Sequence, residues 1–290
     1  SLDNLVGQIQ GTIDSFDYSP SSLVETEPIL KLKHIDLEGD LSLKNKILFA
    51  ELQKFNTEKS SGKIDFSLDF TDGLFLDLSY DYSRLDLSEM RPLGGSRMQG
   101  IARSQGSVIG PISELNIEGM LYLTDFSIMD LNLAEQAQAR FYGYRLKEYE
   151  FFDLEIQRGQ TKLTGPMSMK FGKRIAINTD LEGNGHIEDL SSIFFELPDV
   201  YVPASKIHID VQGFADHLVI NGHAKIQDIS VFGETFDAGE VHLGFDRDFF
   251  TLSEFSAERY FGGNLLARGS YPSNKENAIF EIILTDLPIG

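Results

Sequence analysis

Three stretches of the chain repeat one short motif that contains a glutamate. Residues 52–62 read LQKFNTEKSSG, residues 149–159 read YEFFDLEIQRG and residues 252–262 read LSEFSAERYFG, so an apolar residue, a Phe, a Glu and a Gly recur together. The carboxylates of Glu58, Glu155 and Glu258 could supply acid–base chemistry, but such catalysis requires a second carboxyl group held nearby with a different pKa. No partner acid recurs at a fixed spacing beside them. The pattern therefore favours solvated strand positions, and we expect no enzyme.

Histidine supplies the second candidate chemistry, because imidazole is a common zinc ligand. His208, His217, His223 and His242 lie close together in the sequence. Three of them, at 208, 223 and 242, alternate with apolar neighbours, which predicts that they project from the polar face of strands. A surface metal site needs convergent ligands, and this spacing alone does not provide them. We expect no metal and no cofactor.

Two acidic segments resemble the beginnings of calcium loops. Residues 69–73 read DFTDG and residues 246–248 read DRD, but neither continues with the later Gly and Glu of a full site. Solvated acidic turns are the better interpretation. The sequence also contains no phosphate-cradling Gly loop, nucleophile elbow or HExxH motif.

The composition excludes several classes of protein. A formal net charge of -20 over 290 residues opposes nucleic-acid binding and docking on an anionic membrane surface, because both need Lys and Arg. The absence of Cys excludes disulfides and thiolate metal sites. No run approaches the roughly 20 apolar residues of a membrane helix, and no signal peptide opens the chain. Because Ser1 begins within a strand pattern, we expect a fragment of a longer protein.

Alternating hydrophobicity dominates the chain. In KIDFSLDF (63–70) the apolar residues share one face, LFLDLSY (74–80) follows with the same period, and the residues 71–73 between them have hairpin-turn chemistry. The same period recurs in SELNIEGMLYL, RIAINTDL, KIHIDV, HLVINGHAKI, GEVHLGF and AIFEIIL. These runs predict an all-β antiparallel chain with one polar face. One short amphipathic helix is predicted over 189–197, with Asp189 as its N-cap and Pro198 after its end.

The chain also repeats itself over longer distances. An offset of 200 superposes Phe55 on Phe255 and also matches Gly39, Leu41, Leu43, Leu52, Glu58 and Gly62 with Gly239, Val241, Leu243, Leu252, Glu258 and Gly262. An offset of 103 carries Gly110 onto Gly213, Asp125 onto Asp228, and LNIEG onto LVING. We infer three copies of a unit of about 100 residues in one continuous domain: a partial repeat at 1–84 and full repeats at 85–187 and 188–290. The weakly patterned segment PLGGSRMQGIARSQGS is interpreted as a connection inside the sheet.

The repeated motif has a structural interpretation. A spacing of three between Leu252 and Phe255 breaks strand alternation, so a β-bulge is needed to keep both side chains on the apolar face. The glycines that follow, Gly262 and Gly263, then supply a hairpin turn.

The run from SSIFFELPDVYVPASKIHID to RYFGGNLLARGSY (191–271) resembles the AsmA-like family of bacterial envelope proteins, particularly the TamB type. The shared features are a short L-x-I-x-G, an f-x-x-G-x-v-x-l strand and a final l-x-x-f-x-a-x-x-x-G-G-x-l-x-a-x-G. The resemblance implies an elongated, curled antiparallel sheet, a repeating β-groove or β-taco. It also implies lipid transport in outer membrane biogenesis: a periplasmic conduit, anchored to the inner membrane in the full-length protein, that carries phospholipid between the membranes and has a possible outer-membrane protein partner.

The residues lead to a similar expectation by a separate route. A sheet with one continuous apolar face must bury it against a second layer, itself or a ligand. The alternative to lipid binding is a rigid β-repeat scaffold or spacer, an assembly factor for outer-membrane proteins with a filled interior. For the lipid groove the predicted lining residues are Ile64, Phe66, Leu68, Phe70, Leu74, Leu76, Leu78, Leu115, Ile117, Leu121, Leu123, Ile175, Ile177, Ile207, Ile209, Leu218, Ile220, Ile226, Val241, Leu243, Phe280, Ile282 and Leu284.

Overall fold

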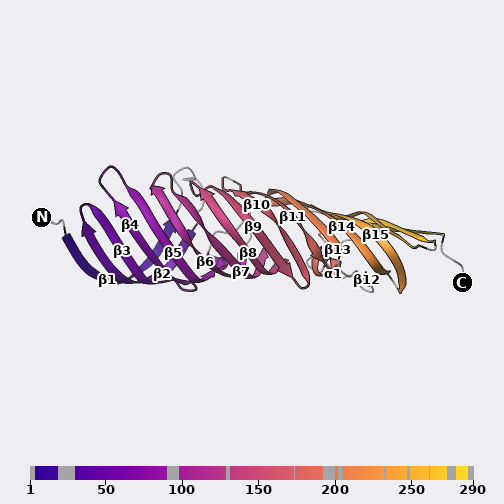
Figure 1. Ribbon diagram of the computed structural model, residues 1–290, viewed down its shortest axis with the longest axis horizontal. Helices are drawn as coiled ribbons and strands as arrows, with labels where there is room; N and C mark the ends of the chain where they lie inside the picture. The colour runs from indigo at the N-terminus through magenta and orange to yellow at the C-terminus, as the bar shows by residue number, and fades with distance from the viewer. Residues whose placement is uncertain are drawn as a thin grey trace. The chain divides into compact units, whose positions relative to one another are not determined.

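The chain is all-β and antiparallel, as its alternation predicts (Figure 1). The computed structural model describes residues 4–18, 30–89, 98–128, 131–172, 174–191, 200–201, 205–231, 233–246, 249–260, 262–272 and 279–286. Within these ranges the only helical segments are one short helix and one 3-10 turn, and neither is long enough to cross a membrane. The elements are β1 (Asn4–Tyr18), β2 (Leu30–Lys44), β3 (Ile47–Asn56), β4 (Ser61–Asp69), β5 (Phe75–Asp86), η2 (Leu87–Glu89), β6 (Met98–Pro111), β7 (Asn116–Ile128), β8 (Leu131–Tyr144), β9 (Glu148–Arg158), β10 (Thr161–Lys170), β11 (Ala176–Gly185), α1 (Ile187–Ser191), β12 (Val200–Tyr201), β13 (Ser205–Phe214), β14 (His217–Val231), β15 (Glu234–Asp246), β16 (Phe249–Glu258), β17 (Asn264–Pro272) and β18 (Ile279–Thr285).

The chain forms two compact units. Unit 1 contains Ser1–Leu154 and Ser168–Ile175, and unit 2 contains Glu155–Met167 and Ala176–Gly290. In unit 1 the strands from β1 to β8 form a meander, each paired antiparallel with the next. In unit 2, β11 pairs with β13, the strands from β13 to β18 again pair in chain order, and β12 pairs with the end of β14.

The hairpin predicted at 71–73 is present between β4 and β5. The Asp69 carboxylate accepts a hydrogen bond from the Thr71 backbone N–H at 2.8 Å, which closes the turn. Hydrogen bonding to Thr71 also lowers the pKa of Asp69. This carboxylate is therefore engaged in turn formation, in agreement with the interpretation of DFTDG as an acidic turn.

The predicted bulges are confirmed in the first and third copies of the motif. Between β2 and β3 the register passes from Leu52 to Lys54 without a partner for Gln53, and between β15 and β16 it skips Ser253 in the same way. In the middle copy the break in alternation comes two residues later than predicted, since the motif places it between Tyr149 and Phe152. There Phe151 and Leu154 are the buried pair, and Phe152 is exposed.

The offset of 103 corresponds to a structural repeat. Gly110 and Gly213 both have positive φ, and a Cβ at either would lie against the carbonyl oxygen four residues later. Asp125 and Asp228 adopt φ of 54° and 55°, a conformation uncommon for residues other than Gly. The offset of 200 holds along β3 and β16, but their partner strands are displaced, because Leu52 faces Gly39 whereas Leu252 faces Leu243.

The helix differs from the prediction at its start. It begins at Ile187, so Asp189 lies inside it and is not its N-cap, while residues 192–197 of the predicted helix lie outside the described residues. The Asp189 carboxylate accepts hydrogen bonds from the backbone N–H groups of Gln160 (2.9 Å) and Thr161 (3.0 Å). Sequence reasoning missed this role because the partners lie far upstream in the chain.

In unit 1 a second carboxylate fastens a hairpin turn in a similar way. Glu89 of η2 accepts hydrogen bonds from the Thr57 hydroxyl, the Lys59 N–H at 3.3 Å and the Ser60 hydroxyl. Both helical turns thus bind the turn of a hairpin, that of β3–β4 in unit 1 and that of β9–β10 in unit 2. The DLS sequences at 86–88 and 189–191 that belong to these two segments are matched by the offset of 103.

Each unit has a cluster of buried apolar side chains, in addition to buried residues elsewhere along its strands. In unit 1 the cluster lies near η2, whose Leu87 is buried and which contacts both β2 and β6. In unit 2 it lies toward the ends of β14 and β15 that adjoin the bulged Asp228. The buried residues in these two clusters are Leu32, Ile35, Leu87, Met98, Ala102 and Ala134 in unit 1, and Ile226, Ile229, Phe236, Ala257 and Leu265 in unit 2.

Candidate apolar binding site

The inner face of unit 2 is built from apolar cross-strand rows. Directly paired residues lie on the same face of a sheet, so the strand registers define these rows. They run across β13, β14, β15 and β16. The rows are Ile207–Ala224–Val241–Phe255, Ile209–Gly222–Leu243–Leu252 and Val211–Ile220–Phe245–Phe250.

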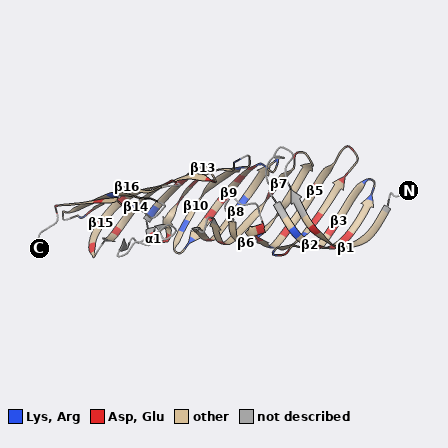
Figure 2. Ribbon diagram, turned by 180° about the vertical axis from the view of Figure 1, so that it is seen from behind, with Lys and Arg blue, Asp and Glu red and all other residues tan. Residues whose placement is uncertain are grey.

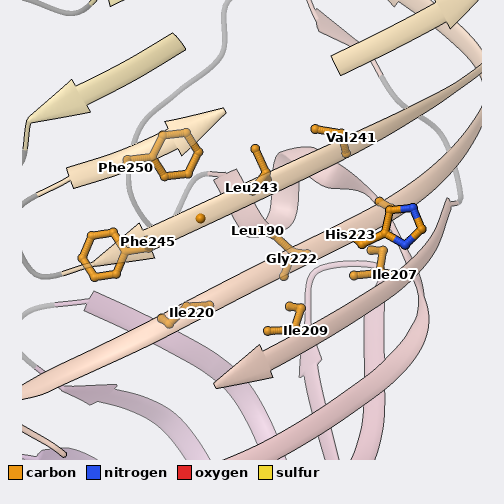
Figure 3. A pocket seen from close by; sticks show the side chains of 12 residues that line it. Leu190, Ile207, Ile209, Ile220, Gly222, His223, Val241, Leu243, Phe245 and Phe250 are labelled. Carbon is orange, nitrogen blue, oxygen red and sulfur yellow. The ribbon is translucent and has the colours of Figure 1, made fainter. Parts of the chain in front are cut away.

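A hollow opens over these rows (Figure 3). The free space over these rows is about 590 Å³ when the open solvent at its mouth is counted. Four adjacent strands supply its walls, and Leu190 of α1 adds an apolar side chain from outside the sheet. The lining is hydrocarbon apart from His223: Leu190, Ile207, Ile209, Ile220, Gly222, His223, Ala224, Val241, Leu243, Gly244, Phe245 and Phe250. Such a surface can exclude water around a hydrocarbon chain but offers no set of groups for acid–base catalysis.

Gly222 creates part of this space. It occupies an inner-row position between Ile209 and Leu243, where a larger side chain would project into the hollow. A Cβ built at Gly222 would meet only the Leu243 Cβ, at 3.7 Å, which is ordinary van der Waals contact. The backbone therefore tolerates a side chain at this position, and its absence leaves room.

The equivalent position in unit 1 is filled. The offset of 103 relates Gly222 to Gly119, which pairs with Gly106 on β6. The Tyr80 hydroxyl lies 2.7 Å from the position a Cβ would take at either glycine, so this side chain covers both. Tyr80 pairs with Gly106, whose equivalent in unit 2 is Ile209. Ile209 pairs with Leu181, so a shorter side chain takes the place of the tyrosine. In unit 1 the Tyr80 side chain therefore fills the space that remains open over Gly222 in unit 2.

Unit 1 nevertheless carries a partly exposed apolar stripe. The row Ala50–Phe66–Leu78–Val108–Ile117 crosses five strands. Only Ala50 is fully buried, and the four larger side chains retain intermediate exposure. A packed protein core normally buries such residues completely, so this part of the inner face is not filled by the described residues.

The predicted lining residues fall into three groups. All of those that lie in paired strands share the inner face by register, but only Ile207, Ile209, Ile220, Val241 and Leu243 converge on the hollow. The buried group is Leu115, Ile175, Ile207, Ile226 and Val241. The partly exposed group is Ile64, Phe66, Leu68, Leu76, Leu78, Ile117, Leu121, Leu123, Ile177, Ile209, Leu218, Ile220 and Leu243. The exposed group is Phe70, Leu74, Phe280, Ile282 and Leu284.

Sequence reasoning missed seven residues of the hollow: Leu190, Gly222, His223, Ala224, Gly244, Phe245 and Phe250. Phe245 continues the alternation of Val241 and Leu243, and Phe250 pairs with it across the turn, so the strand pattern carried a signal for both. The only sequence signal at Gly222 was its alignment with Gly119 at the offset of 103. No pattern in the sequence could place Leu190, because its contact depends on how α1 returns to the sheet.

Acidic positions recur along the strands (Figure 2), and the other candidate residues are solvated or paired with charged groups. Glu155 forms an ion pair with Lys162 at 2.7 Å, and Glu58 and Glu258 are exposed. The three glutamates therefore keep to the solvated positions expected of them. Among the histidines, His208 contacts Asp180 at 2.7 Å, and His217 lies 3.5 Å from Asp246. The remaining two histidines come together on one outer row.

Two partly buried tyrosines of unit 1, Tyr80 and Tyr82, provide a test of how closely this region packs. Burial raises the pKa of Tyr82 to about 12 from its usual 10, and the charges of Tyr80 and Glu89 add to this effect. The folded chain thus keeps this proton where the unfolded chain releases it. The stabilisation is complete below pH 10 and is lost as the pH rises toward about 12.

We therefore expect the free energy of unfolding to fall steeply above pH 10, by up to about 3 kcal/mol from Tyr82. Tyr82→Phe should flatten this part of the profile, whereas Tyr122→Phe, at an exposed position, should leave it unchanged. Urea unfolding at several pH values between 8 and 12 measures both. Identical profiles for the parent and Tyr82→Phe would show that this side chain does not pack as described.

No protein-family model, curated protein or solved structure matches this chain. The resemblance of residues 191–271 to AsmA-like proteins therefore rests on sequence motifs.

Proposed function

We propose that the apolar inner face binds the acyl chains of phospholipid, as one segment of a groove that carries lipid between the inner and outer membranes of a bacterial envelope. The observation that carries the proposal is the hollow over β13–β16, which is lined by hydrocarbon and open to solvent. Exposed apolar area of this kind is costly in water and is normally covered by a partner. An acyl chain meets the requirements of the site, since it needs no hydrogen bonds from the walls.

The partly exposed stripe of unit 1 supports the same function. Its row from Phe66 to Ile117 presents hydrocarbon to solvent at intermediate exposure. Among the described strands, acidic residues such as Asp65 of β4 and Glu240 of β15 alternate with the apolar residues of the inner face, so each unit separates a polar surface from an apolar one. Transport between membranes, the envelope location and an outer-membrane partner follow from the family resemblance and are part of the proposal.

A rigid scaffold with a filled interior is the second candidate. The buried clusters around Ile35 in unit 1 and Ile229 in unit 2 favour it, because these parts of the inner face already pack on protein. The two functions differ at the hollow, where a scaffold needs no ligand.

Filling the hollow distinguishes them. Gly222→Leu should place a side chain among Ile209 and Leu243 and displace an acyl chain without introducing charge or backbone overlap. We expect the parent to retain phospholipid in native mass spectrometry and the variant to retain at least about fivefold less, since the apolar area available for burial falls.

Asn221→Leu is the matched control. It adds the same side chain one residue away, at an exposed position on the outer face of β14. Lipid retention should match the parent. If the parent carries no lipid, or if both variants carry as much as the parent while remaining folded, a lipid site at this hollow is ruled out.

A further inference from the structure

We propose that His223, Glu240 and His242 form a binding site for a zinc-like divalent metal ion on the outer face of unit 2. The inference does not depend on lipid binding: strand register places the side chains of His223 and His242 on the outer face, although His223 also borders the hollow. The sequence predicts no metal site, because it does not reveal which of the four histidines become neighbours.

The strand registers bring two imidazoles together. His223 of β14 is paired directly with His242 of β15, so the two side chains leave the same face of the sheet. Their rings are stacked with centroids 4.4 Å apart and an interplanar angle of 15°. The flanking row Ala224–Val241 is buried on the inner face, which places the two histidines outside.

Glu240 completes the group because it lies two residues from His242 on the same strand and therefore on the same face. Its Oε2 lies 3.9 Å from the His223 Nε2 and 4.0 Å from the His242 Nε2. The three ligand atoms all lie within 4.8 Å of one another. Two nitrogens and one oxygen are a donor set that zinc uses, with a fourth position left for water.

The distances leave little movement to complete coordination. Bonds of about 2.0–2.2 Å in a tetrahedral site place ligand atoms about 3.4 Å apart, so a gap of up to 4.8 Å must close by at most about 1.4 Å. Rotation of exposed side chains covers that distance. The three side chains retain 33%, 46% and 47% exposure, so they have room to rotate onto an ion.

His223 also carries an unused ligand atom. Its Nε2 is buried and has no hydrogen-bond partner among the described residues. A buried nitrogen without a partner is costly, and a metal ion would supply the missing interaction. Ring stacking alone does not explain this atom, because stacking leaves the nitrogen unsatisfied.

The surrounding charges both favour and oppose a cation. Glu254 pairs directly with His242 and adds negative charge beside the site. Lys225 opposes binding, but its Nζ lies 3.5 Å from the other carboxylate oxygen, Oε1, which leaves Oε2 for the ion. His208 pairs with His223 from the other side and is held by Asp180 at 2.7 Å, so it is not a ligand in this arrangement.

Titration of the untagged chain with zinc chloride tests the site. Calorimetry should show one Zn²⁺ per chain, with binding weakened at acid pH because protons compete for the imidazoles, and no comparable binding of Mg²⁺. His223→Ala and His242→Ala should each weaken binding by at least about 100-fold, and Glu240→Gln by about tenfold.

The controls are His208→Ala and His217→Ala, which lie nearby but outside the group and should bind zinc within about twofold of the parent. Saturating Zn²⁺ should also raise the melting temperature of the parent but not of His242→Ala. All substitutions are on the outer face, so their metal-free melting temperatures should match the parent. Absence of zinc binding in the parent, or equal loss in His208→Ala and His223→Ala, would overturn the proposal.

Discussion

An aspartate at Ile229 should destabilise unit 2 by about 4 kcal/mol or more, whereas an aspartate at Ile220 on the same strand should cost far less. Ile229 is fully buried, so the new carboxylate would lose both its hydration and the packing of the isoleucine. Ile220 is only partly buried and borders the open hollow, where water can reach a charge. Urea unfolding measures the two free energies. Ile229→Ala, expected to cost about 3 kcal/mol, keeps the comparison measurable if the aspartate variant does not fold.

The same pair of positions tests lipid binding. Ile220→Asp should abolish most phospholipid retention, because hydrocarbon would have to pass a charged group. A photoreactive residue at Ile220 should crosslink to phospholipid, and one at the outward-facing Asn221 should not. If Ile220→Asp destabilises as much as Ile229→Asp, and no lipid crosslinks at Ile220, the hollow is part of a packed interior and the scaffold is the better interpretation.

Alanine at Gly106 should destabilise unit 1 by about 3 kcal/mol, the upper part of the range for overpacking. A Cβ there would lie 2.7 Å from the Tyr80 hydroxyl and 2.8 Å from the Gly119 Cα, and it would overlap the carbonyl oxygen of Glu118. Two of these obstacles are backbone, so β6 and β7 would have to separate.

Gly7→Ala is the matched control, since a Cβ at this position of β1 would meet nothing within 4 Å. It should change stability by less than about 0.5 kcal/mol. Adding Tyr80→Ala to Gly106→Ala should not restore stability, because the backbone overlap remains. Gly106→Ala as stable as Gly7→Ala would contradict the close approach of the two strands.

The fold class could be predicted because alternation is a local property. KIDFSLDF places its apolar residues on one face whatever the strand pairs with, and the bulge at Ser253 follows from the spacing of Leu252 and Phe255 alone. The predicted start of α1 was wrong because Asp189 was interpreted as a local N-cap. Its carboxylate instead accepts hydrogen bonds from the distant turn at Gln160 and Thr161.

The sites depended on register, which sequence did not supply. The pattern placed His223 and His242 on the polar face, but only the pairing of β14 with β15 sets them side by side. The hollow required knowing that Gly222 lies between Ile209 and Leu243, and that no counterpart of Tyr80 covers it. The alignment at an offset of 200 also hid a register difference. The bulge at Gln53 lies farther from the β2–β3 turn than the bulge at Ser253 lies from the β15–β16 turn.

The bulge at Gln53 keeps the apolar side chains of β3 on one face despite an extra residue in the strand. Side chains of a strand alternate between the two faces of the sheet, so one inserted residue would move every later side chain to the opposite face. Because Gln53 has no partner, the side chains of Leu52 and Phe55 both lie on the inner face. The equivalent bulge at Ser253 means that these strands can differ in length by an odd number of residues without turning their apolar side chains toward water.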